Sequence, residues 1–282
     1  MLKLCAIGVS SMTKTPPRTK TPILKFDSIN VIYNEGKPNQ VHALKDVSGE
    51  IYEGEFISII GPSGCGKSTF LHTLDGLIPP TSGTIFVNGS PVHGPDRDRA
   101  MVFQDFALMP WQTVYQNVAF GLKLEGKPDR KIRDRVMHYI KLVGLEGFEN
   151  KYPHQLSGGM KQRVGIARGF AVEPKILLMD EPFSAIDEQT REIMQEEMLK
   201  IMLHEKKTVV FITHSIDEAV FLSTRIFLMS VRPGQIVDEV KIDIPYPRTL
   251  ETKALPEYQK YKQIIWNHLK GEVRRQYRKG EA

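Results

Sequence analysis

The sequence predicts an α/β protein in which helices pack around a parallel, doubly wound sheet and an α-helical lobe is inserted into this core. Two observations lead to this fold class. Short apolar runs typical of buried parallel strands alternate with amphipathic helical segments on both sides of the middle of the chain. Between about residues 105 and 170 the pattern is mostly helical instead, and the loops there are marked by Pro110, Pro128 and Pro153.

The apolar pattern predicts the first strands and helix of the sheet region. Leu24–Tyr33 and Val41–Ile51 are strand-like, and Phe56–Ile60 is a nearly all-apolar run typical of a buried parallel strand. A glycine-rich loop follows that run at once. The helix beyond the loop has one apolar face, made of Phe70, Leu71, Leu74 and Leu77, and it ends before Pro79, Pro80 and Gly83. Residues 84–88, followed by a turn at Gly89, predict one more strand.

Two strand–helix units follow the predicted lobe, in which Val136, Ile140 and Val143 recur at helical spacing. The first unit is expected to have a strand at 175–179 and a helix at 188–203. The second is expected to have a strand at 208–213 and a helix at 216–222. Residues 226–229 predict another strand. Farther along, one helical face carries Tyr258, Tyr261, Ile265 and Leu269. We expect this face to pack on the protein's own core, and contact with a partner is the alternative.

These elements divide the chain into three expected parts. Residues 1–22 form a disordered leader, because residues 13–22 are rich in Thr, Pro and Lys, and the true start is Met1 or Met12. Residues 23–245 form the α/β domain that contains the lobe, and residues 246–282 form a C-terminal helical tail.

Composition limits the class of protein. With 38 Lys and Arg against 33 Asp and Glu, the net charge is +5, and much of the excess lies near the two ends. Basic ends can contact nucleic acid or anionic lipid, but we expect these ends to be solvated tails. No apolar run reaches the roughly 20 residues of a membrane-spanning helix. The two cysteines, Cys5 and Cys65, lie in unrelated settings, which argues against a structural disulfide and fits a reducing, cytosolic environment.

The first chemical motif is the glycine-rich loop between the predicted strand and helix. It consists of Gly61, Pro62, Ser63, Gly64, Cys65, Gly66, Lys67, Ser68 and Thr69. This pattern matches a P-loop in full, so backbone N–H groups and the helix N-terminus are expected to bind phosphate. Lys67 should reach the β- and γ-phosphates, and the Ser68 hydroxyl should bind Mg²⁺. Cys65 is expected to contribute only its backbone.

The second motif is a pair of adjacent carboxylates, Asp180 and Glu181, at the end of the predicted strand at 175–179. Ligands of open α/β sheets bind at this edge. Two adjacent carboxylates repel each other unless a cation lies between them, which is a reason to expect a metal ion. Asp180 is the expected Mg²⁺ ligand, through water, and Glu181 is placed to polarise an attacking water.

Two further polar residues stand at the ends of strand-like runs. Gln104 follows residues 101–103, and His214 ends the apolar run at 209–213. A lone Gln is usually a surface residue, and a lone His at a strand end is more often structural than catalytic. Their role depends on a larger pattern.

That pattern resembles the ATPase subunits of ABC transporters over roughly residues 24–240. The run Leu156–Arg163, Leu-Ser-Gly-Gly-Met-Lys-Gln-Arg, resembles the signature motif of this family. Gln104 matches the Q-loop glutamine, and His214 matches the switch histidine. Asp187 matches the D-loop, where Ile186 replaces the usual Leu. Tyr33 matches the aromatic residue that stacks on adenine, with core packing as the alternative.

The resemblance implies a P-loop NTPase (RecA-like) core with an antiparallel β subdomain and an α-helical lobe that carries the signature. It implies ATP as ligand and Mg²⁺ bound by Ser68, Gln104 and Asp180. It also implies that two copies pair head to tail. One copy would complete the nucleotide site of the other with Ser157, Gly158, Gly159, Gln162 and Asp187. Glu181 and His214 would then order the attacking water, and Gln104 would sense the metal ion and the γ-phosphate.

The residues around the Q-loop indicate a branch of the family. The Pro110-Trp111 pair, with Gly94-Pro95-Asp96 before it, resembles the importers of nitrate, sulfonate, taurine and bicarbonate. This implies that residues 108–118 face a transmembrane permease at the cytoplasmic face of the membrane. A solute-binding protein would take part indirectly, and no nucleic acid is expected. No residue of this subunit should recognise the cargo. Trp111 is equally consistent with ordinary packing.

Three alternatives stay open at this point. An importer ATPase for a pyrimidine-type vitamin precursor belongs to the same branch. A soluble ABC ATPase acting on nucleic acid or ribosomes is the second, although the chain has no room for a long coiled coil and contains one P-loop. The third is a module that binds ATP without hydrolysing it, and the presence of Lys67, Asp180, Glu181 and His214 argues against it.

Overall fold

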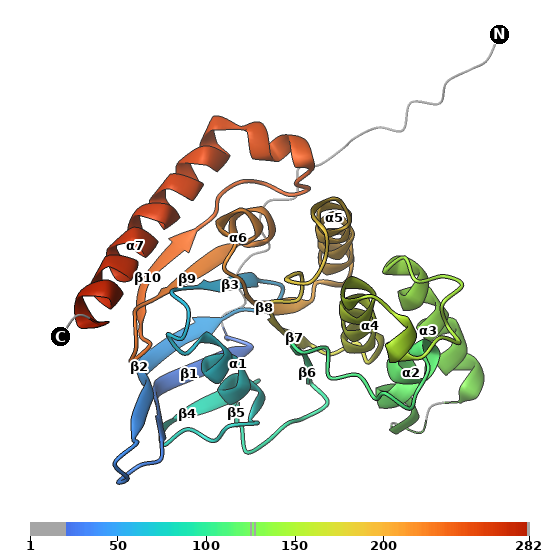
Figure 1. Ribbon diagram of the computed structural model, residues 1–282, viewed down its shortest axis with the longest axis horizontal. Coiled ribbons are helices and arrows are strands. Elements are labelled where there is room, and N and C mark those ends of the chain that lie inside the picture. Colours follow the sequence, from blue (N-terminus) through green and yellow to red (C-terminus); the bar gives the residue numbers. More distant parts are fainter. Residues whose placement is uncertain (1–20, 125, 127, 281–282) are drawn as a thin grey trace.

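The computed structural model describes residues 21–124, 126 and 128–280. Two sheets form the body of the protein, and a helical lobe projects from one side (Figure 1). The expected leader, with Met12 and Cys5, lies outside the described residues except for positions 21 and 22. The other expected boundaries, at residues 23, 245 and 246, stay predictions.

The larger sheet confirms the expected parallel core. Its strands lie in the order β10-β9-β3-β8-β7-β6, and all neighbours are parallel except β10, which pairs antiparallel with β9 at the edge. The bounds are β3 Phe56–Ile60, β6 Arg99–Val102, β7 Ile176–Asp180, β8 Thr208–Ile212, β9 Arg225–Met229 and β10 Ile236–Lys241. Every residue of β3, β7, β8 and β9 is buried, as expected of parallel strands covered on both faces. Strand β10 was not predicted, because its half-exposed residues lack an apolar run.

The smaller sheet is antiparallel throughout, with the order β2-β1-β4-β5. Its strands are β1 Leu24–Tyr33, β2 Val41–Ile51, β4 Ser82–Val87 and β5 Ser90–Pro91. Helix α1, Lys67–Asp75, shares an apolar core with this sheet and with one face of the parallel sheet. Phe26 of β1 illustrates the shared core, because its ring contacts the rings of Phe70 and Phe227 at centroid distances of 5.1 and 6.4 Å.

A second apolar core covers the other face of the parallel sheet and continues into the lobe. The lobe consists of α2 Val114–Leu124, α3 Asp129–Leu142 and α4 Gly158–Ala171 (Figure 1). Helix was expected from about residue 105, but the first helix of the lobe begins nine residues later, at Val114. Residues 103–113 form a loop instead. Buried Asn117 holds this loop by bonding the backbone of Met109, Gln112 and Thr113.

Helices α5 Glu188–Glu205 and α6 Ile216–Leu222 follow β7 and β8, and short 3-10 turns lie at Pro153–Gln155 and Leu250–Ala254. The C-terminal segment forms the long helix α7, Pro256–Gly280, which runs past β9 and β10 (Figure 1). Tyr258 and Ile265 of α7 are fully buried, and Tyr261 and Leu269 pack partly buried against the same core. The expectation that this face packs on the protein itself is confirmed.

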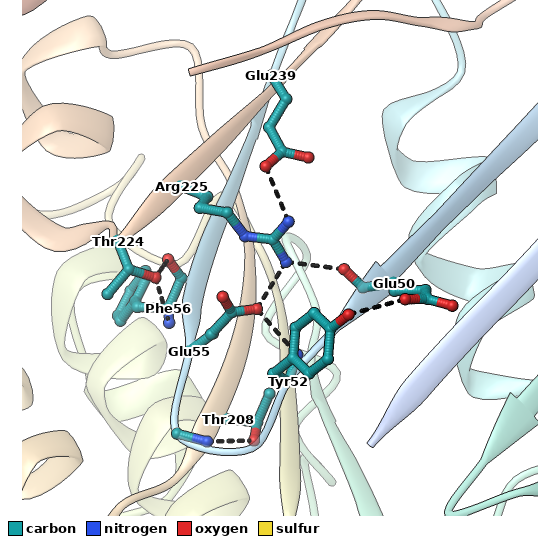
Figure 2. Close-up of polar contacts among 9 residues, drawn as sticks. Glu50, Tyr52, Glu55, Phe56, Thr208, Thr224, Arg225 and Glu239 are labelled. Carbon is teal, nitrogen blue, oxygen red and sulfur yellow. Dashed lines mark hydrogen bonds and ion pairs between the residues drawn. The ribbon is translucent and has the colours of Figure 1, made fainter. Parts of the chain in front are cut away.

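Arg225, at the start of β9, joins the two sheets (Figure 2). Its Nη2 donates to the Glu50 carbonyl oxygen of β2 at 2.7 Å and to Glu55 Oε2 at 2.6 Å, and its Nη1 donates to Glu239 Oε1 of β10 at 2.9 Å. The residue is only 5% exposed. Since its partners lie in the stretch 50–55, which leads from β2 to β3, and in β10, this guanidinium fixes the smaller sheet against the edge of the larger one.

We predict that Arg225→Met lowers the free energy of unfolding by about 3 kcal/mol, because it leaves the Glu55 carboxylate without its cation in a mostly buried setting. Urea denaturation followed by circular dichroism measures the change. Lys241→Gln, at an exposed position of β10, is the matched control and should change stability by less than about 0.5 kcal/mol. Equal stability of the Arg225 variant and the control would contradict the bridging role.

Candidate functional site

A cleft of about 680 Å³ opens beyond the carboxyl ends of the parallel strands. The predicted phosphate loop lines it with Gly61, Ser63, Gly64, Gly66, Lys67, Ser68 and Thr69. The remaining lining residues are Tyr33, Val41, Ala43, Gln104, Glu181, His214 and Arg232. This volume lies within the range of small-molecule and cofactor sites and suits a nucleotide.

The phosphate loop lies between β3 and α1, as the sequence predicts. Gly66 caps α1 with φ at 114°, and a Cβ there would lie 2.9 Å from the Ala43 carbonyl oxygen, so only glycine fits. Lys67 begins the helix, and its Nζ donates to the carbonyl oxygens of Gly61 and Pro62 at 2.9 and 3.0 Å. These bonds hold the ammonium group against the start of the loop. The loop thus combines a helix N-terminus with a fixed cation, which suits an anionic phosphate chain.

Pro62 and Cys65 belong to the loop but do not line the cleft. Cys65 is 1% exposed, and burial raises the pKa of its thiol, although the Lys67 charge acts in the opposite direction. A buried, protonated thiol is a packing group rather than a nucleophile. Its position is consistent with the expectation that only its backbone takes part.

The expected catalytic residues contact one another through Glu181. His214 Nδ1 lies 2.9 Å from Glu181 Oε1, and Gln104 Nε2 donates to Glu181 Oε2 at 3.2 Å. These residues follow β8, β7 and β6, which are neighbours in the sheet, so the strand order brings their side chains to one place. Glu181 has a positive φ of 47°, and its N–H donates to the Ile212 carbonyl oxygen at 3.1 Å. A non-glycine residue held in this strained region is typical of a functional site.

Asp180 offers an oxygen without a partner. The residue is 3% exposed, and within the described part of the chain its Oδ1 accepts no hydrogen bond. Leaving a buried carboxylate oxygen unsatisfied is costly, and a cation would remove that cost. In the described ranges no group of three or more His, Cys, Asp or Glu side chains could bind a metal alone. Mg²⁺ fits this setting, because it commonly keeps one or two carboxylates, water and substrate phosphate oxygens as ligands.

Tyr33 lies at the end of β1 and lines the cleft. It is 38% exposed, so core packing does not explain it, and its hydroxyl lies 3.2 Å from Thr69 Oγ1. Val41 and Ala43 line the cleft beside it. An aromatic ring with small apolar neighbours is suited to stacking on a flat heterocycle.

The signature residues do not line this cleft. Ser157 caps α4, where its Oγ accepts a bond from the Met160 N–H at 3.3 Å, and both Ser157 and Gly158 are exposed. Asp187 caps α5, and the hydrogen bond from the Thr190 N–H lowers the pKa of its carboxyl. A Cβ at Gly159 would lie 3.1 Å from the Ala185 carbonyl oxygen, so the signature turn lies beside the D-loop. Together they form one exposed surface away from the cleft.

Gln162 does not meet its expectation as a nucleotide contact. Its side chain is fully buried, and neither amide atom has a partner in the described part of the chain. The physical reason is its place on the inward face of α4, five residues after Ser157, whereas the signature turn lies at the exposed N-terminus. A buried side chain cannot touch a nucleotide bound by a second copy in this conformation.

Arg232 was missed by the sequence analysis, which assigned no element and no site residue to residues 230–245. It lines the cleft, and its Nε and Nη2 donate to the Gly64 carbonyl oxygen at 3.1 and 2.8 Å. A usable signal exists in the sequence, because Arg232 lies in a Pro-Gly turn directly after a parallel strand. Residues in that position gather at the same sheet edge as the P-loop.

We predict that Lys67→Ala weakens nucleotide binding at least about tenfold, because it removes a charge-assisted hydrogen bond to phosphate. Isothermal titration with ATP measures the affinity. Lys175→Ala removes a lysine whose side chain is 59% exposed and lies outside the cleft, so it should bind ATP like the wild type. Unchanged affinity of the Lys67 variant would contradict the assignment of the cleft.

The sequence model of the ABC transporter family matches residues 44–184. The nitrate import ATP-binding protein of Synechocystis sp. is 46% identical over 254 residues, which cover 88% of this chain and 95% of that protein. The taurine import ATP-binding protein of Rhizobium johnstonii is 45% identical over 249 residues, 86% of this chain and 95% of that protein.

A solved structure supports the same relationship. The dimeric ATP-binding cassette in a post-hydrolysis state, bound to ADP and Pi, superimposes with a TM-score of 0.73 at 35% identity. The match covers 78% of this chain and 99% of that chain. The two glycine-rich motifs, the strand order that gathers the polar residues and these relatives lead to one conclusion: the chain belongs to the ABC transporter family and is one of its ATPase subunits.

Proposed function

We propose that this chain is the ATPase subunit of an importer for small oxyanions and that two copies bind ATP between them, head to tail. The observation that carries the proposal is the contact of Glu181 with His214 and Gln104 beside the P-loop. This arrangement suits hydrolysis, because it holds a carboxylate next to the place where the terminal phosphate would lie.

The residues of the cleft have different roles in binding and in hydrolysis. The P-loop N–H groups and Lys67 bind and orient the phosphate chain, and Tyr33 packs on the base. Glu181 orients the attacking water and accepts its proton, while His214 and Gln104 fix the two carboxylate oxygens. Asp180, Ser68 and Gln104 would hold Mg²⁺, which would supply the positive charge that neutralises the phosphates.

A second copy would complete the site from the far side. Ser157 and Gly158 expose a helix N-terminus on the surface, outside the lining of the cleft. A 14-residue helix directed at an anion supplies N–H donors and a favourable dipole. Asp187 lies at the same surface. The dimeric state of the related cassette supports this pairing.

The proposed cargo class comes from the names of the relatives. Their names specify nitrate and taurine, whose charged groups are a small oxyanion and a sulfonate. This favours the oxyanion class, which also includes bicarbonate, over a pyrimidine-type vitamin precursor. The nitrate and taurine relatives are 46 and 45% identical to this chain, although their names specify different solutes. This similarity is consistent with an ATPase subunit that does not contact the solute.

Trp111 marks the proposed contact with the permease. It is 73% exposed, although the loop around it is firmly held by Asn117 and by Arg168, whose guanidinium donates to the Phe106 and Ala107 carbonyl oxygens at 3.0 and 2.6 Å. An exposed Trp on an anchored loop is typical of a binding surface rather than of packing. Among the described helices none is long and apolar enough to cross a bilayer. In the proposed assembly a permease holds this subunit at the cytoplasmic face of the membrane.

We predict that Glu181→Gln keeps ATP binding but lowers the rate of hydrolysis by about 10²- to 10⁴-fold, because the amide cannot accept the proton of water. The variant should also accumulate as an ATP-bound dimer. Phosphate release and size-exclusion chromatography measure the two effects.

Glu146→Gln is the control, since this carboxylate is 68% exposed in its side chain and lies outside the cleft. A Glu181 variant that hydrolyses ATP at the control's rate would refute the catalytic assignment. A variant that loses turnover without forming a dimer would refute the head-to-tail pairing.

We predict that Trp111→Ala uncouples ATP hydrolysis from transport while the isolated subunit keeps its ATPase rate. The removed side chain lies outside the cleft, so only the permease contact is lost. Uptake of labelled nitrate or taurine by the assembled transporter is compared with the ATPase rate. Trp266→Ala, at the other tryptophan, is the matched control on α7. Loss of ATPase activity in the isolated Trp111 variant would contradict the docking role.

A further inference from the structure

The turn between β9 and β10, residues 230–235, packs directly against the outside of the P-loop. A methyl group at Gly234 would overlap the Cys65 carbonyl oxygen, so the two backbones touch. The Gly234 N–H donates to the Ala43 carbonyl oxygen at 2.8 Å, and its own carbonyl oxygen accepts from the Lys45 N–H at 3.0 Å. The turn is therefore fixed to the P-loop on one side and to β2 on the other.

Arg232 projects from this turn into the lining of the cleft. Two of its nitrogens, Nε and Nη2, donate to the single carbonyl oxygen of Gly64. Within the described part of the chain Arg232 forms no ion pair with a carboxylate and no bond to Gln104, Glu181 or His214. Its charge is thus uncompensated at the rim of an anion-binding cleft, where it adds to the charge of Lys67.

The C-terminal helix anchors the turn that carries Arg232. Glu272 of α7 is 7% exposed, and its Oε2 accepts a hydrogen bond at 3.0 Å from the Val231 N–H, 41 residues earlier in the chain. Its Oε1 accepts from Arg275 Nη1 at 2.6 Å, which compensates the carboxylate charge. A buried, satisfied carboxylate on α7 therefore sets the position of the residue next to Arg232.

We propose that Arg232 is a second cationic contact for the bound nucleotide, directed at the portion that ATP and ADP share, and that Glu272 positions it from α7. The contacts of Arg232 and of its turn indicate which part of the nucleotide Arg232 would face. Arg232 is bound to Gly64, and its turn is bound to Ala43 beside Tyr33, whereas the residues expected around the γ-phosphate make no bond with it. The inference rests on nucleotide binding in this cleft, as set out under the proposed function.

Arg232→Gln tests the contact. The variant should bind MgATP and MgADP more weakly by a similar factor, about five- to tenfold, because one charge-assisted interaction is lost for both. Titration calorimetry gives the affinities, and thermal unfolding verifies the fold. The loss should shrink at high salt, since the guanidinium is exposed. Lys241→Gln removes one positive charge from exposed β10 and is the matched control.

Affinities of the Arg232 variant equal to those of the control would overturn the proposal, as would a loss confined to ATP. Wild-type protein that binds neither nucleotide would instead refute the proposed function, so the two failures are distinguishable.

Glu272 supplies an independent test, because it does not line the cleft. Glu272→Ala removes the acceptor for the Val231 N–H and should weaken MgATP and MgADP binding in the same direction. Glu272→Gln keeps an acceptor oxygen and should restore most of the affinity. A merely structural role would lower the melting temperature of the Ala variant without changing its affinity at a temperature where it is folded, and that result would overturn the positioning role.

Discussion

The parallel pairing of β9, β3, β8, β7 and β6 is the constraint on which the cleft depends. Parallel neighbours end at the same edge, so the segment that follows each strand is delivered to one place. The P-loop follows β3, Glu181 follows β7, His214 follows β8 and Arg232 follows β9. The apolar faces of these strands are buried on both sides, which fixes their register and hence the height of each polar residue above the sheet.

Two polar residues at this edge of the sheet are held in energetically unfavourable states. Glu181 adopts a left-handed backbone conformation, and Asp180 buries an unpartnered carboxylate oxygen. Such features persist only when the surrounding structure determines them, and here two complete apolar cores do so. The binding of a nucleotide with its cation would relieve part of this cost. Asp180 and Glu181, which are held at an energetic cost in the free protein, are therefore already positioned for a reaction at this edge.

The site is also divided in space. The cleft contains the phosphate loop together with Gln104, Glu181 and His214, whereas the signature turn and the D-loop share an exposed surface that does not line it. Under the head-to-tail pairing that we propose, hydrolysis would depend on the approach of a second molecule. On the opposite side of the P-loop, the turn at 230–235 connects the cleft with α7 through Arg232 and Glu272. The C-terminal helix is thus part of the support of the nucleotide site, rather than a separate appendage.

The sequence by itself determined the strand–loop–helix unit at residues 56–75, most core strands and helices and the helical nature of the lobe. These features could be predicted because the periodicity of apolar residues and the backbone freedom of glycine act between residues that are close in the sequence. The cooperation of Gln104, Glu181 and His214 was predicted from the family resemblance, since each residue taken alone was ambiguous. Only the tertiary structure decided that β10 completes the sheet, that Gln162 is buried and that Arg232 lines the cleft. These outcomes depend on which distant segment packs on which face, and no local pattern carries that information.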